Sequence, residues 1–172
     1  ATSDPVSARV ATGEPAAVRT TTSEPATGRV PTDQAAAAAA AFRRGELAMK
    51  RDQPGEAVLE FKAACDLNPG EVDYAALLAW AKFCAAGDKA AIAADTRKPL
   101  ERAIARSMRP ELARFYLGRV ERMLGRDREA LRHFQEVVEL RPNHGEAAAE
   151  IRAIEARLAA AAKSGGLFGR KR

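Results

Sequence analysis

One spaced pattern of small residues, a phenylalanine and a proline occurs twice along the chain. Its members are Gly45, Ala57, Phe61, Ala64 and Pro69 in the first copy, and Gly118, Ala130, Phe134, Val137 and Pro142 in the second. Successive members lie 12, 4, 3 and 5 residues apart in both copies, which predicts that the two stretches build the same pair of helices joined by a turn. In such a unit the small residues let two antiparallel helices approach closely, the phenylalanine fills the seam, and the proline ends the second helix.

This pattern resembles the tetratricopeptide repeat family, whose period is about 34 residues. The resemblance implies three repeats, at residues 38–71, 72–110 and 111–144. The middle repeat has 39 residues, five more than the first, and we expect the excess between its two helices, within residues 87–95. Pro99 would then fall near the first turn of the second helix, where proline is tolerated.

A further amphipathic helix is expected at residues 146–163, because Ala147, Ile151, Ile154 and Leu158 form one apolar stripe. A stack of repeats leaves an apolar face at its end, so this helix is predicted to be a C-terminal cap. The resemblance thus implies an all-α, right-handed superhelix of three helix-turn-helix repeats plus a capping helix, over residues 35–163. Alanine-rich repeats of this sort are also similar to modules appended to J-domain or signalling chains in bacteria.

Residues 1–34 contain three tandem decapeptides, SDPVSARVAT, GEPAAVRTTT and SEPATGRVPT. They lack aromatic and long aliphatic side chains, so folding them would bury too little surface to offset the entropy lost. We expect a disordered linker, acting as a spacer or as a docking motif repeated for avidity. Either Thr32 or Asp33 is expected to cap the first helix. A chain that begins in this way is expected to be the C-terminal part of a longer protein, or a chain from which a preceding domain was removed.

The composition indicates a cytoplasmic, non-catalytic protein without a metal or cofactor. No stretch of 18 apolar residues is present, and the chain has two cysteines and two histidines at none of the usual zinc or redox spacings. Phosphate-binding and hydrolase motifs are absent from the sequence. Carboxylates such as Glu121, Glu129 and Glu136 are expected on solvated helix faces.

The family's geometry implies a concave groove that binds a peptide or helix of a partner protein. The residues that it places there are Phe42, Glu46, Met49, Asp73, Trp80, Phe83, Phe115, Arg119, Arg122 and Met123. We expect binding to centre on Trp80, because tryptophan and arginine are enriched among residues that dominate binding energy. For single aromatics such as Phe83 and Phe115, packing between helices is an equally open alternative.

Some family members grip the C-terminal carboxylate of a chaperone with basic and amide side chains at five groove positions. In this chain those positions hold Phe42, Glu46, Leu77, Leu112 and Tyr116. None of the five matches, so a clamp of this kind is not expected here.

The last residues supply a second hypothesis. Ser164, Gly165 and Gly166 are expected to end the capping helix and to leave residues 164–172 as a flexible basic tail. Its apolar and cationic members are Leu167, Phe168, Arg170, Lys171 and Arg172. They are suited to an anionic membrane surface or a nucleic-acid backbone, although each cation contributes only about 1 kcal/mol at such a membrane. A solubilising end, or a short peptide that another protein recognises, is the alternative.

Overall fold

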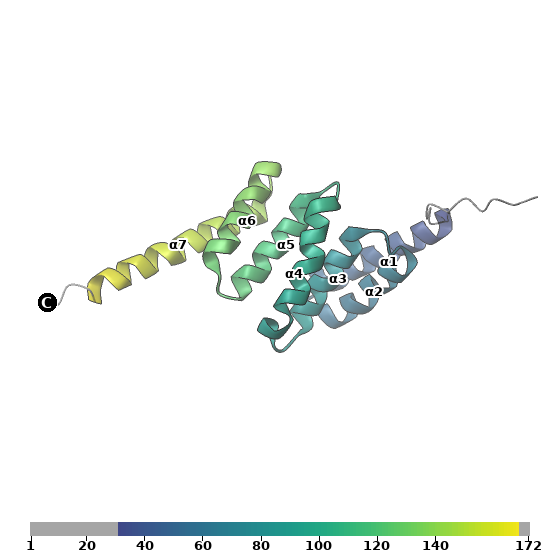
Figure 1. The fold of residues 1–172 in the computed structure, drawn as a ribbon, viewed down its shortest axis with the longest axis horizontal. Coiled ribbons are helices and arrows are strands. Elements are labelled where there is room, and N and C mark those ends of the chain that lie inside the picture. The colour runs from purple at the N-terminus through teal and green to yellow at the C-terminus, as the bar shows by residue number, and fades with distance from the viewer. Residues whose placement is uncertain (1–30, 169–172) are drawn as a thin grey trace, which may run out of the picture.

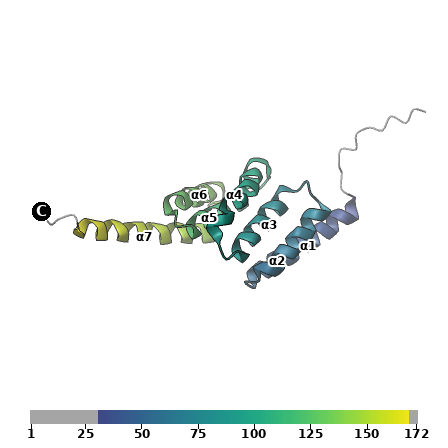
Figure 2. The same ribbon diagram turned by 60° about the horizontal axis from the view of Figure 1, so that its bottom comes forward.

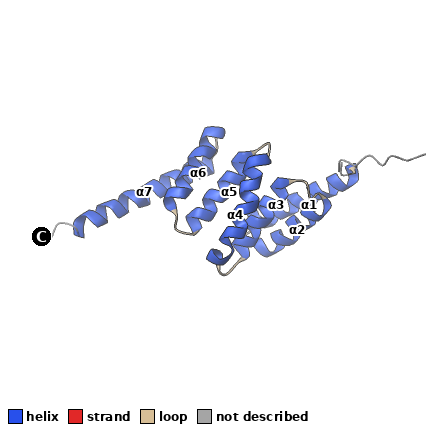
Figure 3. Ribbon diagram, viewed as in Figure 1, coloured by secondary structure: helices blue, strands red, loops and turns tan. Residues whose placement is uncertain are grey.

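The computed structural model describes the backbone of residues 31–168 and the side chains of residues 31–163. Within that range it contains seven helices and no strand (Figures 1 and 3), namely α1 (Thr32–Lys50), α2 (Pro54–Leu67), α3 (Val72–Ala85), α4 (Lys89–Arg106), α5 (Pro110–Met123), α6 (Asp127–Leu140) and α7 (Gly145–Phe168). The all-α prediction is confirmed. Residues 1–30, with the three decapeptides, and residues 169–172, with Arg170, Lys171 and Arg172 of the predicted tail, lie outside the described part of the chain.

The helices are stacked in a row in the order of the sequence, from α1 at one end to α7 at the other (Figures 1 and 2). Each helix contacts the next one along the chain, and α3 also contacts α5. Three clusters of buried side chains run through the row: the first joins α1, α2 and α3, the second α3, α4 and α5, and the third α5, α6 and α7. Because neighbouring clusters share a helix, the core is continuous along the stack, as in a helical-repeat solenoid.

The residues of the repeated sequence pattern pack the two helices of a pair closely together. A Cβ atom added at Gly45 would lie 2.6 Å from two ring carbons of Phe61, and one at Gly118 would lie 2.9 Å from Cε1 of Phe134. Both phenylalanines are fully buried. Only glycine therefore allows α1 to approach α2, and α5 to approach α6, at these distances. The seam predicted from the spacing is present in both copies.

The middle repeat differs from the prediction in where its extra residues lie. Only residues 86–88 separate α3 from α4, and α4 has 18 residues against 14 in α2. The extra residues lengthen α4 because the Asp88 side chain accepts a hydrogen bond from the Ala91 N–H (3.1 Å) and starts the helix early in an alanine-rich segment. Pro99 consequently lies inside α4, not in its first turn. Since proline has no N–H, the carbonyl of Asp95 cannot receive the helical hydrogen bond that residue 99 would otherwise donate.

Both ends of the helical region also differ from the prediction. The residue that precedes the first helix is Pro31, and neither Thr32 nor Asp33 caps it; Asp33 instead lies in the first turn, where the helix dipole favours a negative charge. At the other end, α7 continues through Ser164–Gly165–Gly166 to Phe168. Glycine in a helix costs about 1 kcal/mol relative to alanine but keeps its N–H, so it weakens a helix without necessarily ending it.

Glu121 does not lie on a solvated helix face, contrary to the prediction. The residue is only 4% exposed, and Arg97 of α4 donates to both of its carboxylate oxygens, at 2.5 and 3.0 Å. Glu121 is therefore a buried link between α4 and α5 and not a solvated carboxylate. Glu129 is exposed, as expected, and Glu136 is half-buried and forms an ion pair with Arg114.

Candidate functional site

A hollow of about 310 Å³ lies along the odd-numbered helices of the stack. Its walls come from α1, α3 and α5, from the turn between α1 and α2, from α2 itself, and from the first turn of α7. The lining residues are Glu46, Met49, Lys50, Asp52, Pro54, Phe61, Leu77, Trp80, Cys84, Tyr116, Arg119 and Glu146. The hollow therefore joins side chains that are up to 100 residues apart in the sequence.

Four of the residues predicted for the groove meet in this hollow: Glu46, Met49, Trp80 and Arg119. Trp80 is 3% exposed and belongs to the buried cluster that joins α3, α4 and α5, yet it also lines the hollow and forms part of its floor. The Tyr116 ring lies beside it at a centroid distance of 5.2 Å. The Arg119 guanidinium carbon lies 5.4 Å from the Trp80 ring centroid and 5.7 Å from that of Phe115. The aromatic floor thus carries a cation beside the Trp80 ring.

Three of the predicted aromatics have packing roles. Phe83 is fully buried, in the cluster that joins α3, α4 and α5. Phe115 is 4% exposed and packs against Phe134 between α5 and α6, at a centroid distance of 5.7 Å. Phe42 is half-buried and packs against the rings of Phe61 and Tyr74, at 5.4 and 4.7 Å. For Phe83 and Phe115, the structure agrees with the alternative of packing between helices.

The remaining predicted residues lie outside the lining of this hollow. Asp73 accepts a hydrogen bond from the Ser107 hydroxyl (3.0 Å), which ties α3 to the end of α4. Arg122 forms an ion pair with Glu150 of α7 at 3.2 Å. Met123 ends α5 and is 42% exposed.

Leu77, Tyr116 and Glu146 line the hollow although the sequence pattern did not assign them to the groove. Leu77 and Tyr116 occupy the sixth position of their repeats, which the family uses in its carboxylate clamp. Each lies three residues from a predicted groove residue, Trp80 or Arg119, and this helical spacing is the signal that places it on the same face. Glu146 belongs to the capping helix, and the repeat pattern carries no signal for it. Tyr116 packs against all three buried clusters, so it connects the hollow to the whole core.

Burial and neighbouring charges set the electrostatics of the hollow. Burial raises the pKa of the Cys84 thiol to about 11, so this thiol stays protonated near neutral pH and is a poor nucleophile. Burial also raises the pKa of Tyr116, and the charges of Glu46 and Glu146 add to this while Arg119 opposes it. The lining contains three carboxylates and two cations, so negative charge predominates around the aromatic floor.

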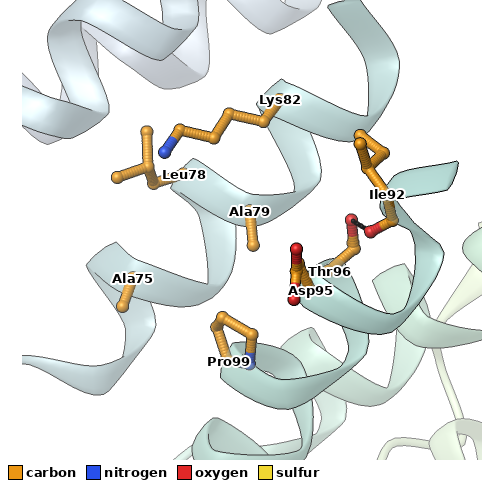
Figure 4. Close-up of a pocket in the computed structure, with 8 residues that line it drawn as sticks. All are labelled: Ala75, Leu78, Ala79, Lys82, Ile92, Asp95, Thr96 and Pro99. Carbon is orange, nitrogen blue, oxygen red and sulfur yellow. Dashed lines mark hydrogen bonds between the residues drawn. The ribbon is translucent and has the colours of Figure 1, made fainter. Parts of the chain in front are cut away.

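A second hollow, of about 380 Å³, lies between α3 and α4 (Figure 4). On α3 it is lined by Ala75, Leu78, Ala79 and Lys82, and on α4 by Ile92, Asp95, Thr96 and Pro99. The α3 residues of the two hollows lie on opposite faces of that helix, given its 3.6-residue turn. The Thr96 hydroxyl donates to the Ile92 carbonyl at 3.0 Å, which leaves a mostly apolar lining. The sequence did not predict this hollow, because it depends on the lengthened α4.

Metal clusters and membrane-spanning helices are absent from the described part of the chain. Over residues 31–168, no group of three or more His, Cys, Asp or Glu side chains is arranged to hold a metal ion. Over the same residues, no helix combines the length and apolar character that a membrane crossing requires.

An open row of helix pairs, with a hollow along the first helix of each pair, defines a helical-repeat protein. Residues 112–144 match the family model described as "Tetratricopeptide repeat". Comparison with curated proteins gave no match. The family match and the fold support the tetratricopeptide repeat family, in agreement with the resemblance noted in the sequence, and domains of this family are generally non-catalytic modules that mediate protein–protein interaction.

Solved structures of such domains share the fold. The tetratricopeptide domain of Arabidopsis OM64 matches with a TM-score of 0.57 and 20% identity, over 72% of this chain and 98% of that chain. The first such domain of human RPAP3 gives 0.59 and 25%, over 74% and 97%. The first such domain of Spaghetti (RPAP3), solved bound to the HSP90 peptide SRMEEVD, gives 0.57 and 24%, over 73% and 98%.

Proposed function

We propose that this protein is a non-catalytic adaptor that binds a peptide or helical segment of a partner protein in the hollow lined by α1, α3, α5 and α7. The observation that carries the proposal is the convergence of side chains from three repeats and the cap on one aromatic floor. Trp80 and Tyr116 supply rigid, desolvated surface, and Met49 supplies a side chain that adapts to its ligand. Buried aromatic side chains of this kind are typical of the few residues that provide most of the binding energy in an interface.

The size and shape of the site support a segment rather than a small metabolite. The hollow continues into a shallower one of about 320 Å³, which shares Arg119 and Glu146 and extends along α7 over Ala149, Glu150 and Ala153. A ligand that follows both hollows runs along several helices, as a peptide does in a groove. Peptide binding by the related domain of Spaghetti (RPAP3) is consistent with this use of the fold.

A selection from a random peptide display library on the immobilised full chain tests the proposal. Selected peptides are synthesised, and their dissociation constants are measured by fluorescence polarisation. Lys50→Trp places a large side chain in the lining of the hollow and should weaken binding by about tenfold or more. The matched control is Lys98→Trp, because Lys98 is exposed on α4 and lies outside the lining. Equal affinity of both variants and the parent chain, or no saturable binder at all, would refute the groove as the binding site.

A further inference from the structure

Arg119 differs from the arginines that flank it on α5. Arg114 is paired with Glu136, and Arg122 with Glu150 at 3.2 Å. Among the described residues no carboxylate lies within ion-pair distance of Arg119, and its Nε atom is buried without a hydrogen-bond partner. The Nε atoms of the other two arginines are also unbonded, so the missing carboxylate is what distinguishes Arg119.

The Arg119 guanidinium is also held in a defined position. Two ring faces lie beside it, those of Trp80 at 5.4 Å and Phe115 at 5.7 Å, and both rings are buried. A guanidinium that uses its faces for aromatic contact keeps its N–H edge for hydrogen bonds, and the fork of that edge fits a carboxylate with two parallel bonds. Because the side chain is already ordered, little further entropy is lost when such a partner arrives.

Arg119 lies where the two hollows on this side of the stack meet, since it lines both of them. A segment that crosses from the aromatic floor onto α7 must pass this guanidinium. The other charges along the way are mostly negative: Glu46, Asp52 and Glu146 outnumber Lys50 in the first hollow. Glu146 also lines the second hollow, together with Glu150, which is paired with Arg122. A strongly acidic ligand is therefore disfavoured everywhere except at Arg119.

We infer that Arg119 binds the side-chain carboxylate of a single aspartate or glutamate in the partner segment, and that the residues flanking this acid are uncharged or basic. The inference rests on the proposed function, because it names the chemistry of the ligand in the same groove. It does not use the family's carboxylate clamp, whose positions hold Phe42, Glu46, Leu77, Leu112 and Tyr116 in this chain.

The test is a double-mutant cycle between the chain and a selected peptide. Peptides obtained on the full chain are expected to share one acidic position with neutral or basic neighbours. Changing that acid to its amide should weaken binding to the parent chain by about tenfold or more, and by much less to the Arg119→Gln variant. Arg128→Gln is the matched control, because Arg128 is exposed on α6 and lines neither hollow.

The two proposals fail in different ways. If peptides bind and Lys50→Trp weakens them, but the acid-to-amide change costs the same in the parent chain and in the Arg119→Gln variant, the groove stands and the role of Arg119 is wrong. The role of Arg119 is also wrong if the selected peptides carry several acids or none. The amide change is made in the peptide, so the result with the parent chain does not depend on the stability of the Arg119→Gln variant. Arg119→Lys, which keeps the charge but loses the fork, supplies a second variant.

Discussion

Adding a single methyl group at Gly45 tests how closely the first two helices are packed. In Gly45→Ala the new Cβ would lie 2.6 Å from two carbons of the Phe61 ring, and that ring is fully buried. Real Cβ atoms do not approach other atoms so closely, so the ring or the helix must move. Overpacking of this kind costs about 1–3 kcal/mol, whereas alanine gains up to about 1 kcal/mol over glycine from helix propensity. The net expectation is a loss of about 1–2 kcal/mol in the free energy of unfolding.

Two other glycines provide comparisons for this loss in the free energy of unfolding. Gly118→Ala should cost less than Gly45→Ala, because its new Cβ would lie 2.9 Å from the Phe134 ring. Gly55→Ala, near the start of α2, meets no atom within 4 Å and should stabilise the chain by a few tenths of a kcal/mol, up to about 1 kcal/mol.

Urea unfolding followed by far-ultraviolet circular dichroism measures the three variants against the parent chain. Phe61→Leu, which removes part of the ring, should reduce the penalty of Gly45→Ala in the double variant, because the two changes are coupled through one contact. If Gly45→Ala stabilised the chain as much as Gly55→Ala does, the close seam between α1 and α2 would be refuted.

Three further predictions concern α4, α5 and α6. Glu121→Ala should lower the free energy of unfolding by about 3 kcal/mol, because it leaves the Arg97 guanidinium without its partner between α4 and α5; an unchanged urea midpoint would contradict the buried pair. Pro99→Ala should stabilise the chain by up to about 3 kcal/mol in the same assay, because the Asp95 carbonyl regains a helical hydrogen bond, and destabilisation would show that the proline ring is needed for packing. Burial lowers the pKa of His133 below its ordinary 6.5, so the unfolded chain binds a proton more readily and stability should fall as the pH drops through about 6.5; His133→Gln should flatten this part of the thermal-melting profile, and an identical slope in both proteins would exclude His133 as a source.

The prediction of the fold rested on local information. The residues that mark each seam, such as Gly45 and Phe61, lie in helices that are adjacent in the sequence, so their contact follows from helical geometry and a short turn. The middle repeat lacks this pair of residues, and its boundary was predicted less well. There the N-cap at Asp88 outweighed the family period and lengthened α4.

The candidate site could be predicted only in part. Met49, Trp80 and Arg119, which the family's geometry assigns to the groove, line the hollow. Phe83 and Phe115 occupy positions of the same kind and are buried as Trp80 is, but they do not line the hollow. The helical period gives the face of a helix on which a side chain lies, but how much of that face the next helix covers depends on the crossing of both.

The sequence by itself determined that this chain forms paired helices, which glycines meet which phenylalanines, and that a capping helix follows, because these contacts join neighbouring segments. Only the tertiary structure decided which side chains share the hollow, that Glu121 is buried, and that Arg119 has no carboxylate beside it within the described residues. Those properties depend on how the helices of one repeat pack against those of the next. The angles and distances of that packing arise from contacts between repeats and leave no periodic trace in any single segment.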